Sequence, residues 1–113
     1  MKHKYKLMDM RDNLKLCEFI ENLSKKFPYK DTFTSNTAIS IPTHTHNDYE
    51  ARLFLEGTAI FNVDGKIYKC SPGSYIEIDP EVPHSFEFDG DISLKVLRFF
   101  SNDTGWVSNF CPD

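Results

Sequence analysis

The spacing of apolar residues along this chain changes once, from a helical repeat to the two-residue repeat of strands. Between residues 13 and 27, apolar side chains recur at every third or fourth position and form one stripe of a helix. This stripe consists of Leu16, Ile20, Leu23 and Phe27. Asp12 or Asn13 can cap the start of the helix, and Pro28 ends it. We therefore predict a helix over residues 13–27 that covers one side of a sheet.

From Thr32 onward, apolar and polar residues alternate as they do in strands with one buried face. Turn residues divide this part of the chain, and Asp64-Gly65 is typical of a two-residue type I′ hairpin turn. Residues 1–11 form either a short edge strand or a mobile segment, and we expect residues 101–113 to be irregular. The predicted strands cover residues 33–41, 49–56, 59–63, 66–70, 75–78, 84–88 and 92–100.

These elements predict an all-β fold with one N-terminal helix, arranged as a sandwich or a small barrel. A length of 113 residues is that of one domain. Within this single domain of residues 1–113 we assign residues 1–31 to a helical segment and residues 32–113 to the barrel. Pro42 is expected to end the first strand of the barrel, because proline cannot donate to a central ladder.

Charge and cysteine content narrow the range of partners. The formal net charge is −4, and no cluster of lysines and arginines is interleaved with aromatic residues. We therefore expect no nucleic acid and no membrane as partners, and a small molecule as the ligand. The basic start lacks a following apolar run, so we expect no signal peptide. Cys17, Cys70 and Cys111 are odd in number and far apart, which favours the reducing cytoplasm.

Three histidines and one glutamate are candidates for the ligands of one metal ion. Side chains two residues apart on a strand point to the same side, so we expect His44, His46 and Glu50 to share a face. His84 can close the site from a second strand. Imidazole and carboxylate suit a divalent transition metal, Fe²⁺, Ni²⁺, Mn²⁺, Co²⁺ or Zn²⁺, and the sequence does not choose among them. The alternative is that His44 and His46 are surface residues of a loop.

Further residues on the same strands are candidates for substrate contacts. Arg52 and Phe54 continue the face that carries Glu50, and Phe86 follows His84 at the same spacing. We predict that Phe54 and Phe86 line a pocket. Arg52 and Arg98 either recognise an anionic oxygen substrate, as catalytic residues, or form salt bridges at the rim of the barrel.

Two sequence motifs resemble those of the cupin superfamily. The first is His44-x-His46-x3-Glu50-x6-Gly57, and the second is Gly73-x5-Asp79-Pro80-Glu81-x2-His84. The resemblance implies a small jelly-roll β-barrel that encloses a metal ion. It also implies the ligand set of that ion, which is His44, His46, Glu50 and His84.

Within the cupins, the chain is similar to the acireductone dioxygenases of methionine salvage. The similarity rests on Arg52 after the first motif, Phe86 after the metal histidine, the strand over residues 95–100 and Trp106 in the tail. It implies a dioxygenase that uses Fe²⁺ or Ni²⁺ to cleave an enediol substrate, whose negative charge Arg52 and Arg98 offset. Departures from the family pattern are Asp79 and Glu81 in the second motif and Ser85 after the metal histidine.

Other functions fit the same motifs, because one fold hosts many chemistries. A second possibility is another metallocupin enzyme, such as a sugar isomerase or epimerase, or a different dioxygenase. A third is a binding module without catalysis. We also predict a homodimer, because the face of the strand opposite the ligands is apolar and needs either the N-terminal helix or a second subunit to cover it. That face consists of Tyr49, Ala51, Leu53 and Leu55.

Overall fold

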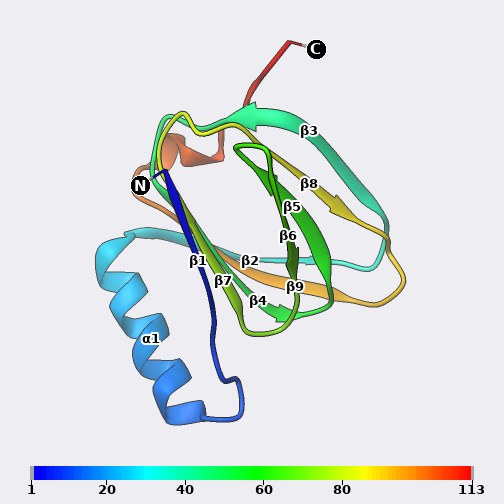
Figure 1. Cartoon of the computed structure of the whole chain (residues 1–113). Coiled ribbons are helices and arrows are strands. Elements are labelled where there is room, and N and C mark those ends of the chain that lie inside the picture. Colours follow the sequence, from blue (N-terminus) through cyan, green and yellow to red (C-terminus); the bar gives the residue numbers. More distant parts are fainter. Residues whose placement is uncertain (1, 113) are drawn as a thin grey trace.

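The computed structural model describes residues 2–112 and consists of ten strands, one α-helix and one 3₁₀ turn (Figure 1). Most of the predicted strands appear within two residues of their expected bounds. The elements in chain order are β1 (His3–Leu7), α1 (Asn13–Lys26), β2 (Tyr29–Ser35), β3 (Ile39–Thr45), β4 (Glu50–Glu56), β5 (Ala59–Val63), β6 (Lys66–Cys70), β7 (Ser74–Ile78), β8 (His84–Phe88), β9 (Leu94–Phe100), η1 (Asp103–Trp106) and β10 (Asn109–Phe110).

The strands form two five-stranded antiparallel sheets that face each other. One sheet has the order β1-β7-β4-β9-β2 and the other has the order β10-β3-β8-β5-β6. Alternate residues of both sheets point inward, as the two-residue repeat predicted, and bury an aromatic core. Its largest members are Phe54, Phe61, Ile76, Phe86 and Phe88. This arrangement confirms the predicted all-β fold with one N-terminal helix.

Helix α1 covers the outer face of the first sheet (Figure 1). The helix begins where the Asp12 carboxylate accepts a hydrogen bond from the Lys15 amide at 3.1 Å, as predicted for a capping residue. The Lys26 ammonium pairs with Glu77 of β7 at 2.5 Å. The apolar stripe of α1 packs on Ala51 and Leu53, which are fully buried. The helix of the same chain therefore covers the apolar face that suggested a second subunit.

The single strand predicted over residues 33–41 is wrong, because the chain changes sheets there. Strand β2 pairs with β9 in the first sheet, and β3 pairs with β8 in the second. The turn between β2 and β3 is closed locally, since the Ser35 hydroxyl donates to the Thr37 carbonyl at 2.9 Å. Pro42 does not end β3 as predicted, because a bulge between Ile41 and His44 accommodates it.

Both ends of the chain also join the sheets. Strand β1 is an edge strand paired with β7, so residues 1–31 are not only helical, and the boundary drawn after residue 31 falls inside β2. The tail expected to be irregular contains η1 and the two-residue strand β10. Strand β10 pairs with β3, where Phe110 lies opposite His44. Of the helices in residues 2–112, none has the length and apolar character needed to cross a membrane.

Two glycines with similar backbone conformations differ in their surroundings. Gly65 has φ +84° in the predicted hairpin turn, and a Cβ atom added there would meet nothing within 4 Å. Gly57 has φ +81° at the end of β4, and a Cβ atom added there would lie 2.6 Å from the Ser93 carbonyl oxygen. Gly57 thus combines a left-handed backbone with a close approach of two chain segments.

This pair of glycines yields a matched test of the fold. We expect Gly65→Ala to lower the free energy of unfolding by about 1 kcal/mol, the cost of a left-handed backbone for alanine. Gly57→Ala has the same backbone cost and adds a steric overlap between the new Cβ and the Ser93 carbonyl oxygen. We expect it to lower the free energy of unfolding by about 3 kcal/mol. Urea unfolding followed by circular dichroism measures both values. Equal costs for the two variants would show that the contact with Ser93 does not constrain the fold.

Candidate metal centre

The four predicted ligand residues come from three strands and one loop. His44 lies on β3, His46 lies in the loop after it, Glu50 begins β4 and His84 begins β8. The expectation that His44, His46 and Glu50 share one face of a single strand is wrong, because the chain reverses between residues 46 and 50 and enters the other sheet. The side chains still meet, since β3 and β4 face each other across the barrel.

The three histidines form one buried group. Their exposed fractions are 5% for His44, 5% for His46 and 2% for His84, and one ring nitrogen of each lies within 4.8 Å of one on each of the others. Glu50 is 1% exposed. One of its carboxylate oxygens lies 2.9 Å from Nε2 of His84, and the other lies 3.3 Å from Nε2 of His46. This burial excludes the alternative of surface histidines in a loop.

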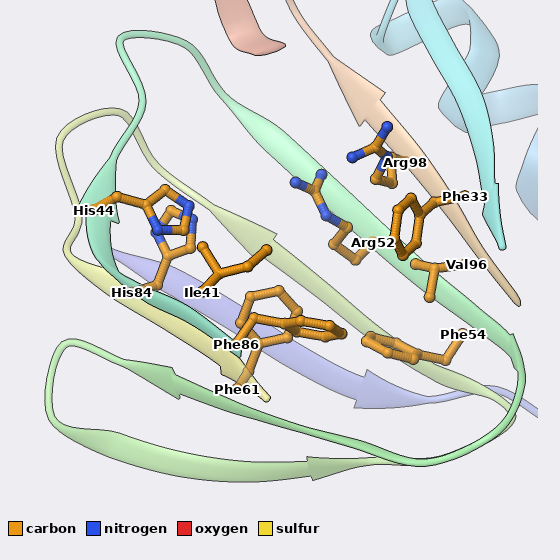
Figure 2. A pocket seen from close by; sticks show the side chains of 10 residues that line it. All are labelled: Phe33, Ile41, His44, Arg52, Phe54, Phe61, His84, Phe86, Val96 and Arg98. Atoms are coloured by element: carbon orange, nitrogen blue, oxygen red, sulfur yellow. The ribbon is translucent and has the colours of Figure 1, made fainter. Parts of the chain in front are cut away.

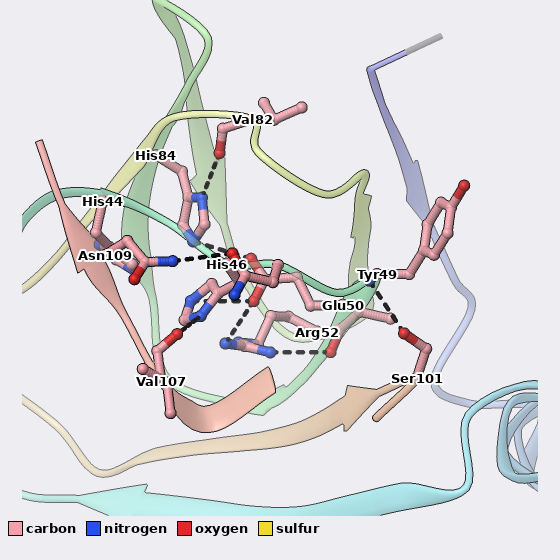
Figure 3. A network of polar contacts seen from close by, with 12 residues as sticks. His44, His46, Tyr49, Glu50, Arg52, Val82, His84, Ser101, Val107 and Asn109 are labelled. Carbon is pink, nitrogen blue, oxygen red and sulfur yellow. Dashed lines mark hydrogen bonds and ion pairs between the residues drawn. The ribbon is translucent and has the colours of Figure 1, made fainter. Parts of the chain in front are cut away.

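Backbone carbonyls set the tautomer of all three histidines, and Figure 3 shows the contacts of His46 and His84. Nδ1 of His44 lies 2.8 Å from the Pro42 carbonyl, and Nδ1 of His84 lies 2.9 Å from the Val82 carbonyl. Nδ1 of His46 lies 2.8 Å from the carbonyl of Val107. A carbonyl only accepts hydrogen bonds, so each Nδ1 carries a proton, and in a neutral ring Nε2 then keeps a free lone pair. That is the form in which imidazole binds a metal.

The buried location also sets the charge of these groups. Burial lowers the pKa of His44 and of His46 below the ordinary value of 6.5, which keeps both rings neutral at pH 7. Burial alone would raise the pKa of Glu50, but the positive charge of the adjacent Arg52 guanidinium lowers it, and the pKa is about 2. The centre therefore presents the neutral rings of His44 and His46 and one carboxylate anion, that of Glu50.

Several buried atoms of this centre have no hydrogen-bond partner within residues 2–112. They are Nε2 of His46, Nε2 of His84 and Oε1 of Glu50. Nε2 of His84 and Oε1 of Glu50 lie 2.9 Å apart without a hydrogen bond between them, and the Nε2 of His46 also faces the Glu50 carboxylate. Buried polar atoms without partners are costly. Their convergence fits a bound cation, and neutral imidazole with carboxylate is a suitable donor set for a divalent transition metal.

A cavity of about 80 Å³ adjoins the histidines. Figure 2 shows His44 and His84 at one end, the two arginines on the facing side and aromatic rings along the remaining wall. The cavity-lining residues Arg52, Phe54, Phe86 and Arg98 were anticipated from the sequence. Those that the sequence analysis missed are Phe33, Ile41, Phe61 and Val96. The two-residue repeat of the strands predicts that these residues point inward, but it does not distinguish residues that line a cavity from residues that fill the core.

The two arginines line the cavity and are also paired with carboxylates. Arg52 and Arg98 lie opposite each other on β4 and β9, and Asp31 lies opposite Arg98 on β2. Arg98 makes two hydrogen bonds to Asp31, at 2.8 and 2.5 Å, and Arg52 lies 3.3 Å from Glu50. Like charges on adjacent strands repel. The carboxylates of Glu50 and Asp31 offset this repulsion. The arginines therefore form salt bridges and line the cavity at the same time, so a salt-bridge role does not rule out contact with a substrate.

The two acidic residues of the second motif and the tryptophan of the tail lie outside the cavity. Asp79 and Glu81 are not among its lining residues, and Glu81 is exposed. Trp106 packs on Phe100, with ring centres 4.2 Å apart, and lies against Arg98 rather than over the cavity. The contact of Val107 with His46 had no signal in the sequence, because a backbone carbonyl carries none.

Comparison with known proteins identifies relatives of this chain. The family model described as cupin domain matches residues 35–100. The acireductone dioxygenase of Alcanivorax borkumensis is 37% identical over 71 residues, which are 59% of this chain and 39% of that protein. The acireductone dioxygenase of Hydrogenobaculum sp. is 30% identical over 95 residues, which are 80% of this chain and 50% of that protein. The chain thus spans half or less of the length of these curated relatives.

Solved structures share the fold. The acireductone dioxygenase from Bacillus anthracis, with a cadmium ion in its active centre, has a TM-score of 0.70 and 20% identity, and the match covers 96% of this chain and 83% of that one. The DMSP lyase DddQ from Ruegeria pomeroyi has a TM-score of 0.62 and 20% identity, over 72% of this chain and 41% of that one. Together with the family model, which matches more than half of the residues, these findings show that the chain belongs to the cupin family.

Proposed function

We propose that this protein is a metal-dependent dioxygenase that acts on acireductone or a similar enediol. The observation that carries the proposal is the convergence of three imidazole nitrogens and the Glu50 carboxylate inside the barrel, without hydrogen-bond partners for most of these atoms. The similarity to proteins named acireductone dioxygenase supports the choice of substrate class.

In this proposal His44, His46, His84 and Glu50 hold one divalent ion. Fe²⁺ and Ni²⁺ are our first expectations, and Mn²⁺, Co²⁺ or Zn²⁺ suit the same donors. When bound, such an ion would supply a Lewis acid and a template for the substrate. The fixed Nδ1–H bonds hold the three rings at the orientation that coordination requires.

The cavity walls supply the remaining roles. The Arg52 and Arg98 guanidinium groups face the space beside the histidines and would stabilise an enediolate there. Arg52 is buried, so its charge is weakly screened by water. Phe54 and Phe86 form the apolar wall and would receive the carbon chain of the substrate, excluding water from it.

Two further expectations concern the protein as a whole. We propose a homodimer. Helix α1 already covers Ala51 and Leu53 of the apolar face from which we predicted a second subunit, and the half-exposed Tyr49 is the part of that face still open to a partner. We also propose a cytoplasmic location, which agrees with cysteines that are all free in the described chain.

The four histidines of the chain allow a matched test of metal binding. We expect His84→Ala to weaken Ni²⁺ binding on the order of 100-fold or more, because a ligand is lost. His3→Ala removes the one histidine outside the site and should leave the affinity unchanged. Isothermal titration calorimetry measures both. Similar affinities for the two variants would contradict the assignment.

The role of Glu50 has its own matched pair. Glu50→Gln keeps the shape of the side chain but removes the charge, and we expect it to weaken Ni²⁺ binding by about 10-fold. Glu87→Gln makes the same change at an exposed position of β8 and serves as the control. A normal affinity in Glu50→Gln would remove the carboxylate from the ligand set and leave the three histidines.

Catalysis is tested by oxygen uptake with synthetic acireductone and the Fe²⁺-loaded protein. We expect uptake that falls about 100-fold or more in His46→Ala and stays normal in His3→Ala. If iron-loaded protein consumes no oxygen, the dioxygenase proposal is wrong. Turnover of a sugar substrate without oxygen would then indicate an isomerase or epimerase, and tight ligand binding without turnover would indicate a binding module.

A further inference from the structure

We propose that Asp48 is a positioning residue for the metal centre. It holds the segment after β9 in place, and that segment supplies the carbonyl that orients His46. In this assignment Asp48 touches neither metal nor substrate, and it acts through Thr104 and Val107. The inference rests on the proposed role of His46 as a ligand, but its first test does not require a metal.

Asp48 is a buried carboxylate without a cationic partner in the described part of the chain. It lies in the turn between His46 and Glu50 and is 7% exposed. One carboxylate oxygen accepts a hydrogen bond from the Asn102 amide at 2.6 Å, and the other accepts one from the Thr104 hydroxyl at 2.5 Å. Hydrogen bonds to an ionised acceptor are stronger than neutral ones. Both donors belong to the segment that follows β9.

This segment, residues 101–107, is hydrogen-bonded to the turn that carries Asp48, and we call it the arch. At its start, the Ser101 amide donates to the Tyr49 carbonyl, and the Tyr49 amide donates to the Ser101 hydroxyl, both at 3.1 Å (Figure 3). In the middle, Gly105 lies so close to Phe100 that an added Cβ would be 2.3 Å from its ring. These contacts attach the arch to the turn that carries Asp48 and to the end of β9.

A continuous series of contacts leads from Asp48 to His46. Thr104 donates its hydroxyl to Asp48, and its carbonyl accepts the Val107 amide at 3.1 Å. The Val107 carbonyl in turn accepts the Nδ1 proton of His46 at 2.8 Å. Releasing Thr104 from Asp48 therefore frees the residue whose carbonyl sets the tautomer of His46.

His46 differs from the other two histidines in this respect. His44 and His84 bind the carbonyls of Pro42 and Val82, each two residues earlier in the same stretch of chain. His46 binds a carbonyl 61 residues away. Downstream of Val107, the tail is attached to β3 by the two-residue strand β10 and by the Cys111 amide, which donates to the Thr43 carbonyl at 3.0 Å, and an exposed contact joins Asn109 to Asn47. His44 and His84 are thus internal controls for any change in the arch.

Three variants test the proposal. Asp48→Ala removes the acceptor, and the double variant Asn102→Ala, Thr104→Val removes both donors at exposed positions. Asp103→Ala is the matched control, since it removes an exposed carboxylate from the same arch. The first measurement is a long-range ¹H–¹⁵N spectrum of the histidine rings in metal-free protein, which reports the tautomer. Circular dichroism establishes that each variant is folded.

We expect His46 to become a mixture of tautomers in Asp48→Ala and in the double variant, while His44 and His84 keep the Nδ1–H form. Ni²⁺ affinity, measured by titration calorimetry, should fall about 10-fold in both and stay within twofold of wild type in Asp103→Ala. A purely structural role would not single out one histidine. If Asp48→Ala does not fold, the double variant decides.

The outcomes separate this inference from the proposed function. An unchanged His46 tautomer in the folded variants would overturn the positioning role, whatever the metal affinity. An altered tautomer with unchanged Ni²⁺ affinity would likewise overturn it, because orientation would not matter to binding. A wild-type protein that binds no Ni²⁺ would refute the metal centre, while the tautomer data would still support or overturn the link from Asp48 to His46.

Discussion

The structure depends on one electrostatic requirement, which is the compensation of a carboxylate buried inside an apolar barrel. Glu50 is almost inaccessible to water, and an unpaired charge in such a place is expensive. Arg52 lies 3.3 Å from it, and His46 and His84 approach it with their Nε2 atoms. Arg52 places one positive charge beside the Glu50 carboxylate. The other side of the carboxylate faces the imidazoles, where a bound divalent cation would balance the remaining negative charge.

The architecture serves this requirement from several directions. The pairing of β3 with β8 places His44 and His84 of one sheet beside each other, facing Glu50 of the other sheet. Helix α1 covers the outer face of β4, where Ala51 and Leu53 pack on the apolar side chains of the helix. The inner face of the same strand carries the polar side chains Glu50 and Arg52. The arch from Ser101 to Val107 supplies the carbonyl that orients the third ring, that of His46.

Local patterns in the sequence were sufficient for the helix, for the hairpin at Asp64-Gly65 and for most strands, because each depends on nearby residues. The same patterns could not separate β2 from β3, since a change of sheet is a long-range event marked only by a short polar turn. They brought His44, His46 and Glu50 together for a wrong geometric reason. The contact from Val107 to His46 was beyond them, because it joins residues 61 positions apart through a backbone atom.

The most direct measurement is a crystal structure of the protein grown with Ni²⁺, with anomalous data collected at the nickel edge. The account predicts a single strong peak about 2 Å from Nε2 of His44, His46 and His84, with a Glu50 oxygen at a similar distance. A peak bound through Nδ1 of these rings, or a nickel site elsewhere with Glu50 still paired only to Arg52, would contradict it.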